Sequence, residues 1–221
     1  MSKAEALKPR QINKVLEKIL MMQDPETKRA AMVLSHAGLR VSEVARLDVK
    51  TLLFPSGMVR TEVFLPAKIC KGTKSRTIWL SNKKSRKIIQ EYIDYRHKRK
   101  WGLSLEGDQY QGLNPDSKLL YNNRGRAYSL SDKIRKLQDG TVKTYKACDA
   151  LEDQFRKIYI KCGLRGCSSH TGRKSIATNA ANNGVELDDI ARLLGHSDPE
   201  MTLYYIQIGK KELERCYEVA Y

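Results

Sequence analysis

The chain has 221 residues, a length that suits one domain built around a single hydrophobic core. Hydrophobic residues make up 41% and charged residues 30%, a balance that excludes a disordered chain. The 41 basic residues outnumber the 25 acidic ones and give a formal net charge of +16. This excess predicts an anionic partner, with nucleic acid first and an acidic membrane surface second. No apolar stretch approaches the roughly 20 residues that span a bilayer, so we expect no membrane partner.

Cysteine usage and the first residues predict where the protein works. Residues 4–23 alternate charged and apolar side chains, which is not the pattern of a signal peptide. The five cysteines are odd in number and lack close pairing, as expected in a reducing cytoplasm. Cys162, Cys167 and His170 could supply three metal ligands, but a fourth is missing and the spacing is loose for zinc. We therefore expect a cytoplasmic, nucleoid-associated protein that needs no metal and no cofactor.

The first half of the chain predicts helices around a small sheet. Apolar residues at helical spacing predict three helices, over residues 9–22, 26–37 and 42–47. Two β-rich runs follow, at 58–65 and 76–80, and they flank a basic turn around Gly72. We expect a small antiparallel hairpin or a three-stranded sheet there, with a basic tip. Ser81 is then expected to cap a long helix that ends near Lys98.

The second half begins with a loop region and continues as short helices. Residues 101–128 are rich in Gly, Asn and Asp, and residues 119–121 are expected to form a short buried strand among them. Helical patterns follow over residues 130–137, 150–162, 171–183, 187–194, 199–205 and 210–219. The fold class that we predict is mainly α with a small antiparallel β-sheet, an α+β fold.

Four separated segments carry residue types suited to phosphate chemistry. They are residues 36–44 (HAGLRVSEV), 71–76 (KGTKSR), 170–173 (HTGR) and 193–198 (LLGHSD). Tyr205 follows His196 by nine residues. Arginine forks bind phosphate in a bidentate manner and stay charged. A tyrosine, with a free pKa of about 10, becomes a useful nucleophile at neutral pH only with help from its neighbours.

At these residues the chain resembles the tyrosine recombinase (phage integrase) family. That family carries an arginine in a GLRxSE element, a lysine in a β-hairpin, an H-x-x-R helix, an LGH element and a tyrosine nine residues after that histidine. All five occur here in order, and the resemblance covers residues 7–208. It implies a catalytic domain over residues 1–208 with the family's catalytic-domain fold. It also implies the catalytic residues Arg40, Lys71, His170, Arg173, His196 and Tyr205.

The roles implied by the resemblance agree with the chemistry of the side chains. Tyr205 would attack a DNA phosphate, and Lys71 would protonate the leaving 5′ oxygen. Arg40 and Arg173 would hold the phosphate charge that metals hold in nucleases. His170 would act on the tyrosine proton or orient the phosphate, and His196 would add a hydrogen bond to it.

Alternatives remain at three of these positions. Lys68 and Lys74 compete with Lys71, which the match to the family's hairpin element favours. Tyr204 competes with Tyr205, which the nine-residue step favours, and Tyr204 is then expected to pack in the core on the opposite side of its helix. In isolation, Arg40 would be a surface ion-pair partner of Glu43, and His36 is expected to be structural.

The implied function is site-specific recombination that integrates, excises or inverts DNA. The alternatives are a topoisomerase-like nicking and relaxing enzyme, and a non-catalytic DNA-binding regulator of the same fold. The implied partners are double-stranded DNA, three further copies in a synaptic homo-tetramer, and accessory DNA-bending or directionality proteins; a monomer away from DNA is left open. Most family members carry a separate N-terminal DNA-gripping domain that the printed sequence does not include. Residues 209–221 are expected to be a tail that docks on a neighbouring protomer, or folds back as a helix on its own.

Overall fold

The structure is a computed structural model that describes residues 4–70, 74–105, 107–136 and 140–207, apart from the side chain of Lys143. Its first helices and strands are α1 (Pro9–Ile19), α2 (Pro25–His36), α3 (Val41–Arg46), α4 (Val49–Leu52), β1 (Glu62–Leu65), β2 (Arg76–Trp79) and α5 (Lys83–Lys98). The others are a 3-10 turn (Gln109–Gly112), β3 (Ser131–Lys136), β4 (Val142–Ala147), α6 (Asp149–Lys161), α7 (Thr171–Asn182), α8 (Leu187–Leu194) and α9 (Glu200–Leu203). The prediction of a mainly helical α+β fold is confirmed.

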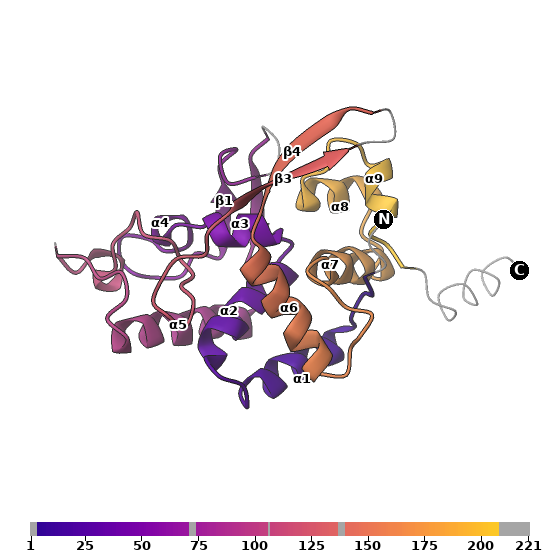
Figure 1. Cartoon of the computed structure of the whole chain (residues 1–221). Helices are drawn as coiled ribbons and strands as arrows, with labels where there is room; N and C mark the ends of the chain where they lie inside the picture. Colours follow the sequence, from indigo (N-terminus) through magenta and orange to yellow (C-terminus); the bar gives the residue numbers. More distant parts are fainter. Residues whose placement is uncertain (1–3, 71–73, 106, 137–139, 208–221) are drawn as a thin grey trace, which may run out of the picture.

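Helix α2 lies in the middle of the helical body, where it packs against α1, α3, α5 and α7 (Figure 1). Its residues from Ala30 to Ser35 are all buried, so it has no solvent-facing stripe over that stretch. The start of α7 approaches it so closely that a Cβ on Gly172 would lie 2.3 Å from the Ser35 Oγ and 2.5 Å from its carbonyl oxygen. Glycine is therefore required at this crossing, which fixes where the next residue, Arg173, enters the core.

The predicted hairpin between residues 58 and 80 is confirmed as the antiparallel pair β1 and β2. Val63 pairs with Ile78, and both are buried against the helical body. The long helix after it begins one residue later than predicted. Asn82, not Ser81, is the N-cap, and its side chain accepts a hydrogen bond from the Lys84 backbone N–H.

The helix predicted over residues 130–137 is wrong, because this segment is strand β3, paired with β4 in a second two-stranded ribbon. Within Ser131–Lys136 the single aliphatic side chain, Ile134, is 71% exposed and provides no apolar stripe for a helix to bury. The partner strand reads Val-Lys-Thr-Tyr-Lys-Ala and is rich in β-branched and aromatic residues. Gly140 precedes β4 with a φ of +81°, a conformation that favours glycine.

The loop of residues 101–128 is organised by one buried arginine, Arg96 at the end of α5. Its guanidinium donates to the carbonyl oxygens of Trp101, Lys118 and Leu119. The predicted burial of residues 119–121 holds for Leu119 and Leu120, but the segment makes only an isolated bridge, from Tyr121 to residue 127, instead of a strand. The Leu119 backbone N–H donates to the Leu47 carbonyl, which ties this loop to the end of α3.

The last described elements form a small layer of their own, at the side of the molecule where α7, α8 and α9 lie together (Figure 1). Ala177, Ile190 and Leu194 are its buried core. The helix predicted over residues 199–205 is shorter, since α9 covers only Glu200–Leu203. The predicted helix at residues 210–219 and the tail of residues 209–221 lie outside the described residues. Among the helices of the described part, none is both long and apolar enough to cross a membrane.

Candidate active site

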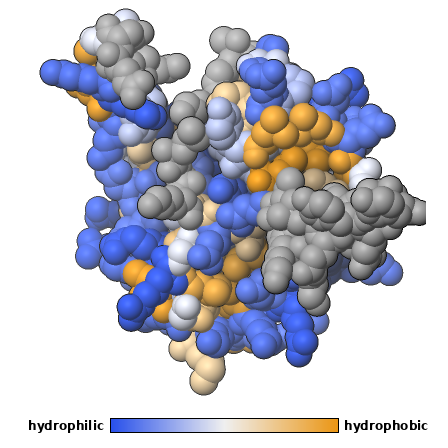
Figure 2. Space-filling model, turned by 90° about the vertical axis from the view of Figure 1, so that its right-hand side faces the viewer, coloured by the Kyte–Doolittle hydropathy of each residue, from blue (hydrophilic) through white to orange (hydrophobic). Residues whose placement is uncertain are grey.

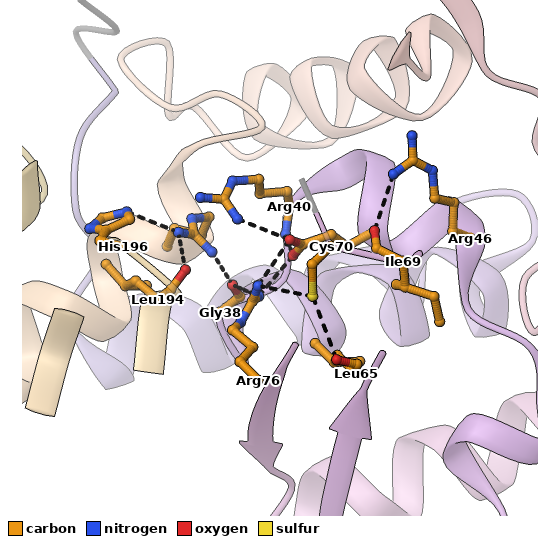
Figure 3. Close-up of polar contacts among 11 residues, drawn as sticks. Gly38, Arg40, Arg46, Leu65, Ile69, Cys70, Arg76, Leu194 and His196 are labelled. Carbon is orange, nitrogen blue, oxygen red and sulfur yellow. Dashed lines mark hydrogen bonds and ion pairs between the residues drawn. The ribbon is translucent and has the colours of Figure 1, made fainter. Parts of the chain in front are cut away.

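Arg40 is the N-cap residue of α3 and reaches back to its own helix. Its backbone N–H donates to Glu43 Oε2 at 2.7 Å, and its Nη1 donates to Glu43 Oε1 at 2.9 Å. The side chain of Arg40 keeps one fifth of its surface exposed, whereas that of Glu43 is fully buried. In Figure 3 part of the Arg40 guanidinium points away from this contact. The ion pair with Glu43 therefore orients Arg40 and leaves other N–H groups of the guanidinium open.

Glu43 carries a negative charge inside the protein because arginines surround it. Burial alone would raise the pKa of its carboxyl, but the hydrogen bond and charge of Arg76, with the charges of Arg40 and Arg173, lower that pKa to about 2. Arg76 donates from Nη1 and Nη2 to the two carboxylate oxygens, at 2.9 and 2.8 Å. This carboxylate stays ionised at neutral pH and holds two guanidiniums.

Arg173 enters the site from the first turn of α7 and is 1% exposed. Its Nη1 donates to the Gly38 carbonyl at 2.5 Å, and its Nη2 donates to the Leu194 carbonyl at 2.7 Å. Its Nε is buried and has no partner within the described residues. Burial and the charge of Arg40 lower the pKa of Arg173 to about 9, so the guanidinium remains charged at neutral pH.

His196 follows the C-terminal end of α8, where Gly195 adopts a left-handed conformation with a φ of +65°. Its Nε2 lies 3.1 Å from Arg173 Nη2, and its Nδ1 lies 2.9 Å from Thr202 Oγ1. A guanidinium can only donate, so Nε2 accepts and the ring proton sits on Nδ1. Burial and the neighbouring arginine charges lower the pKa of His196 to about 4, which keeps the imidazole neutral at neutral pH.

Tyr205 lies two residues beyond the end of α9 and is half-buried. Its ring centroid is 4.9 Å from that of His196, and the Arg173 guanidinium lies 5.5 Å from its ring centroid. Tyr204 is 54% exposed, so the expectation that it packs in the core is wrong. The reason is local: α9 ends at Leu203, and Tyr204 therefore does not occupy the inner face of a helix.

One cleft of about 1020 Å³ brings these residues together. Those of its lining residues that the sequence predicted as catalytic are Arg40, His170, Arg173, His196 and Tyr205. The sixth predicted residue, Lys71, lies outside the described residues; Cys70, just before it, lines the cleft. Its two rivals, Lys68 and Lys74, are exposed. His170 is exposed at the N-terminal end of α7, and one wall of the cleft is formed by β3 and β4.

Two further histidine predictions concern His36, expected to be structural, and the possible metal ligands Cys162, Cys167 and His170. His36 is half-buried beside the Tyr159 hydroxyl, with its Nε2 at 3.2 Å, as expected of a structural histidine. Among the described residues, no group of three or more His, Cys, Asp and Glu side chains is arranged to hold a metal ion. Cys162, Cys167 and His170 therefore do not form a shared ligand set. Figure 2 shows that the side on which α7 to α9 lie is mostly hydrophilic, with separate hydrophobic areas.

Sequence reasoning missed Arg76, which opens β2 and is buried behind the site. A signal was present. Arg76, Ile78 and Leu80 alternate along one strand, and side chains two apart face the same side of a strand. A single arginine on an otherwise apolar inner face predicts a buried cation with an acidic partner.

The cleft of this mainly helical domain gathers two arginines, an imidazole and a phenol, and arginine forks are side chains that can bind phosphate. The chain belongs to the Phage integrase family, whose model matches residues 5–212. It is 28% identical over 192 residues to the tyrosine recombinase XerC of Lactobacillus leichmannii, covering 86% of this chain and 53% of that protein. It is 27% identical over 183 residues to the tyrosine recombinase XerD of Oceanobacillus iheyensis, covering 82% and 50%.

The solved structures agree on the fold. The XerA recombinase matches with a TM-score of 0.68 at 19% identity, covering 98% of this chain and 65% of that one. The XerH site-specific recombinase bound to a palindromic difH substrate matches with a TM-score of 0.66 at 19% identity, covering 97% and 52%. The chain spans about half the length of the curated relatives that it matches.

Proposed function

We propose that the chain is the catalytic part of a site-specific recombinase that cuts and rejoins double-stranded DNA through Tyr205. The observation that carries this proposal is the cleft in which the Tyr205 phenol meets the guanidiniums of Arg40 and Arg173. The net charge of +16 favours a polyanionic substrate. The relation to the XerC and XerD recombinases, and the XerH complex with its DNA substrate, support the same function.

The proposed reaction is a transesterification at one DNA phosphate. The Tyr205 phenol oxygen bonds to the scissile phosphorus, and the bond from that phosphorus to the 5′ oxygen breaks. The phenol proton passes to a base, for which His170 is the candidate, and the departing 5′ oxygen takes a proton from Lys71. The 5′ hydroxyl of another strand then attacks the 3′-phosphotyrosine and releases the phenol. The phosphotyrosine conserves the bond energy, so the scheme requires no cofactor.

The two arginines would stabilise the charge that develops on the non-bridging oxygens. Arg40 and Arg173 are held by Glu43 and by the Gly38 carbonyl, respectively, before any substrate arrives, so little reorganisation is needed during the reaction. His196 accepts a hydrogen bond from Arg173 through Nε2, so this nitrogen can donate to a phosphate only after it carries a proton and no longer accepts from Arg173. We propose that the negative charge of the bound phosphate stabilises the protonated imidazole of His196.

The proposed assembly follows the family. A homo-tetramer would hold two duplexes during strand exchange, with residues 209–221 as a tail that docks between protomers and residues 1–208 as the catalytic domain. Accessory bending or directionality proteins would choose among integration, excision and inversion. The four described cysteines are free thiols, which supports a reducing compartment such as the cytoplasm, on DNA of the nucleoid.

The test is a covalent-trapping experiment on nicked duplexes in which the sequence around the nick is randomised. A short fragment beyond the nick diffuses away after cleavage and leaves the protein joined to DNA. We expect an adduct with the wild-type chain, no adduct with Tyr205→Phe, and an adduct with Tyr204→Phe, which serves as the matched control. Sequencing of the trapped DNA identifies the preferred site. Binding without any adduct would favour the non-catalytic regulator.

A second assay separates recombination from nicking and relaxation, which share the same chemistry. A supercoiled plasmid carries two copies of the sequence recovered by trapping. Exchange between the copies is expected, and it changes the restriction pattern of the plasmid. Relaxation of the plasmid without any exchanged product would favour the topoisomerase-like enzyme.

A further inference from the structure

We propose that Arg76, which the reaction scheme does not use, is a positioning residue that holds both phosphate-facing arginines in place. This inference rests on the proposed function, because it concerns the same cleft. Arg76 does not itself line the cleft; it lies behind Arg40 and Arg173, with 5% of its side chain exposed, and its Nη1 donates to the Sγ of the cleft-lining Cys70 at 3.9 Å. Its guanidinium joins three elements that approach the site from different parts of the chain.

The first link is to Arg40 through Glu43. Arg76 Nη1 donates to Glu43 Oε1, the oxygen that also accepts from Arg40 Nη1, and both distances are 2.9 Å. Arg76 Nη2 donates to Glu43 Oε2, the oxygen that also accepts from the Arg40 backbone N–H. Each carboxylate oxygen is thus shared between the two arginines. The bidentate fork of Arg76 sets the plane of the carboxylate, and that plane sets the direction of Arg40.

The second link is to Arg173 through a backbone carbonyl. Arg76 Nη2 donates to the Gly38 oxygen at 3.0 Å (Figure 3). Arg173 Nη1 donates to the same oxygen. The third link is steric. A Cβ on Gly195 would lie 2.8 Å from Arg76 Cδ, so the stem of Arg76 supports the turn that presents His196. One side chain on β2 therefore contacts the supports of Arg40, Arg173 and His196.

The charges around Glu43 explain why this position needs an arginine. Glu43 is faced by Arg40 from its own helix, by Arg76 from β2 and by Arg173 from α7, and the Cys70 thiol lies near it. Three guanidiniums and one carboxylate leave two positive charges uncompensated, which attracts an anion to the cleft. A lysine would keep that charge but provide a single point of contact, so it would lose control of the carboxylate plane.

The test compares single-turnover adduct formation with DNA affinity in Arg76→Lys, Arg76→Gln and the control Arg60→Gln. Arg60 also donates to a backbone carbonyl, that of Leu53, but lies over the Phe54 ring, away from the cleft. For Arg76→Lys we expect cleavage roughly 100-fold slower, as for a misplacement of about 1 Å. Affinity, measured in a Tyr205→Phe background, should change by less than about 3-fold, because total charge is kept. Wild-type cleavage by Arg76→Lys would overturn the proposal.

The pH profile provides a readout that a merely structural role would not move. Burial favours the protonated carboxyl, and the Arg76 hydrogen bond and charge are the largest of the causes that oppose it, so their loss raises the pKa of Glu43 from its low value. In Arg76→Gln the acid limb of the cleavage profile should therefore move to higher pH, because a protonated Glu43 releases Arg40. An acid limb that coincides with that of the wild type contradicts the inference.

A measurement on the wild-type protein covers the case in which Arg76→Gln does not fold. The Glu43 carboxyl carbon is followed by NMR against pH without DNA. We expect no titration between pH 4 and 8, because the pKa of this carboxyl is lowered to about 2. Titration near the ordinary glutamate value of about 4.3 would overturn the arrangement. This result is independent of the trapping assay. A wild-type protein that forms no adduct would contradict the proposed function, whereas the NMR titration would still test the arrangement of Arg76 and Glu43.

Discussion

Two sets of cations lie at or behind the same cleft, and they are held in opposite ways. Arg40, Arg76 and Arg173 are buried or nearly so, and each is fixed by hydrogen bonds to Glu43 or to a backbone carbonyl. On the β3–β4 ribbon, Arg135 and Lys136 are exposed, and Lys146 pairs with Asp132 at 3.1 Å with about half of its side chain in solvent. Buried cations can direct charge at one atom, whereas exposed ones add attraction without fixed geometry. We therefore predict that the first set controls the cleavage rate, directly or through positioning, and that the second set contributes to the attraction of DNA.

The largest effect should come from the buried set. Arg173→Lys keeps the charge but loses the fork that contacts the Gly38 and Leu194 carbonyls. We expect adduct formation to fall about 100- to 1000-fold, the effect of losing one preorganised donor. Quenched trapping time courses measure the rate. Arg165→Lys, at an exposed arginine before α7, is the matched control and should react at the wild-type rate. Equal rates of adduct formation in Arg173→Lys and Arg165→Lys would show that the buried and exposed cations do not differ in their effect on cleavage.

Glu43→Gln tests the stability of the buried set. Three guanidiniums would then lack their carboxylate, and we expect a loss of about 3–5 kcal/mol in the free energy of unfolding. The pH dependence has a definite sign. The pKa of Glu43 is lowered from 4.5 to about 2 in the folded protein, so its contribution is present above pH 4.5 and is lost as pH falls toward 2.

Urea denaturation at several pH values measures this difference between Glu43→Gln and the wild type. The gap should be largest at neutral pH and narrow below pH 4.5. A gap that does not change between pH 6 and pH 3 would show that the carboxylate charge contributes nothing.

His196 should link DNA binding to proton uptake. The pKa of its imidazole is about 4 without DNA, because burial and the charges of Arg173, Arg40 and Arg76 disfavour the cation. The single negative charge of a bound phosphodiester favours the cation, so binding raises this pKa, and affinity should rise as pH falls from 8 to 6. We expect a change of about 10-fold or less. Calorimetry in buffers of different ionisation enthalpy counts the protons taken up.

Two histidine variants show which imidazole takes up the proton when DNA binds. His196→Gln should remove most of the uptake, whereas His170→Gln should leave the part that belongs to His196. Both are made in the Tyr205→Phe background, so that cleavage does not disturb the binding measurement. Uptake that disappears only with His170→Gln would assign the effect to the exposed histidine.

The smallest effect should come from the exposed ribbon. Arg135→Glu and Lys136→Glu are expected to change the free energy of unfolding by less than about 0.5 kcal/mol, since both side chains are exposed. Each should weaken DNA binding a few-fold and reduce the slope of affinity against salt by about 1. Lys87→Glu on α5, which contributes no residue to the cleft, is the control. A loss of cleavage without a loss of affinity would place these residues with the buried set.

Sequence patterns predicted the elements that are determined by residues close together in the chain. The stripes of apolar residues located α1, α2, α6, α7 and α8, and the spacing of the motifs located the cleft residues. The ribbon was missed because Ser131–Lys136 has almost no apolar period, and its strand state depends on pairing with residues 142–147. The network behind the site was missed for a related reason. Glu43, Arg76 and Arg173 are far apart in sequence. Only folding shows that Arg76 donates to Glu43 and that Arg76 and Arg173 share the Gly38 carbonyl as an acceptor.

The Gly38 carbonyl has a consequence for genetics. Two guanidiniums converge on this one main-chain oxygen, which every residue type supplies, so no side-chain replacement removes it. Gly38 has a φ of +94°, so a substitution at residue 38 disturbs the backbone conformation and does not test the oxygen alone. An ester in place of the amide between residues 38 and 39 keeps this oxygen but makes it a weaker hydrogen-bond acceptor. The atom that joins the two arms of the cleft is thus out of reach of side-chain mutagenesis and open to chemical synthesis.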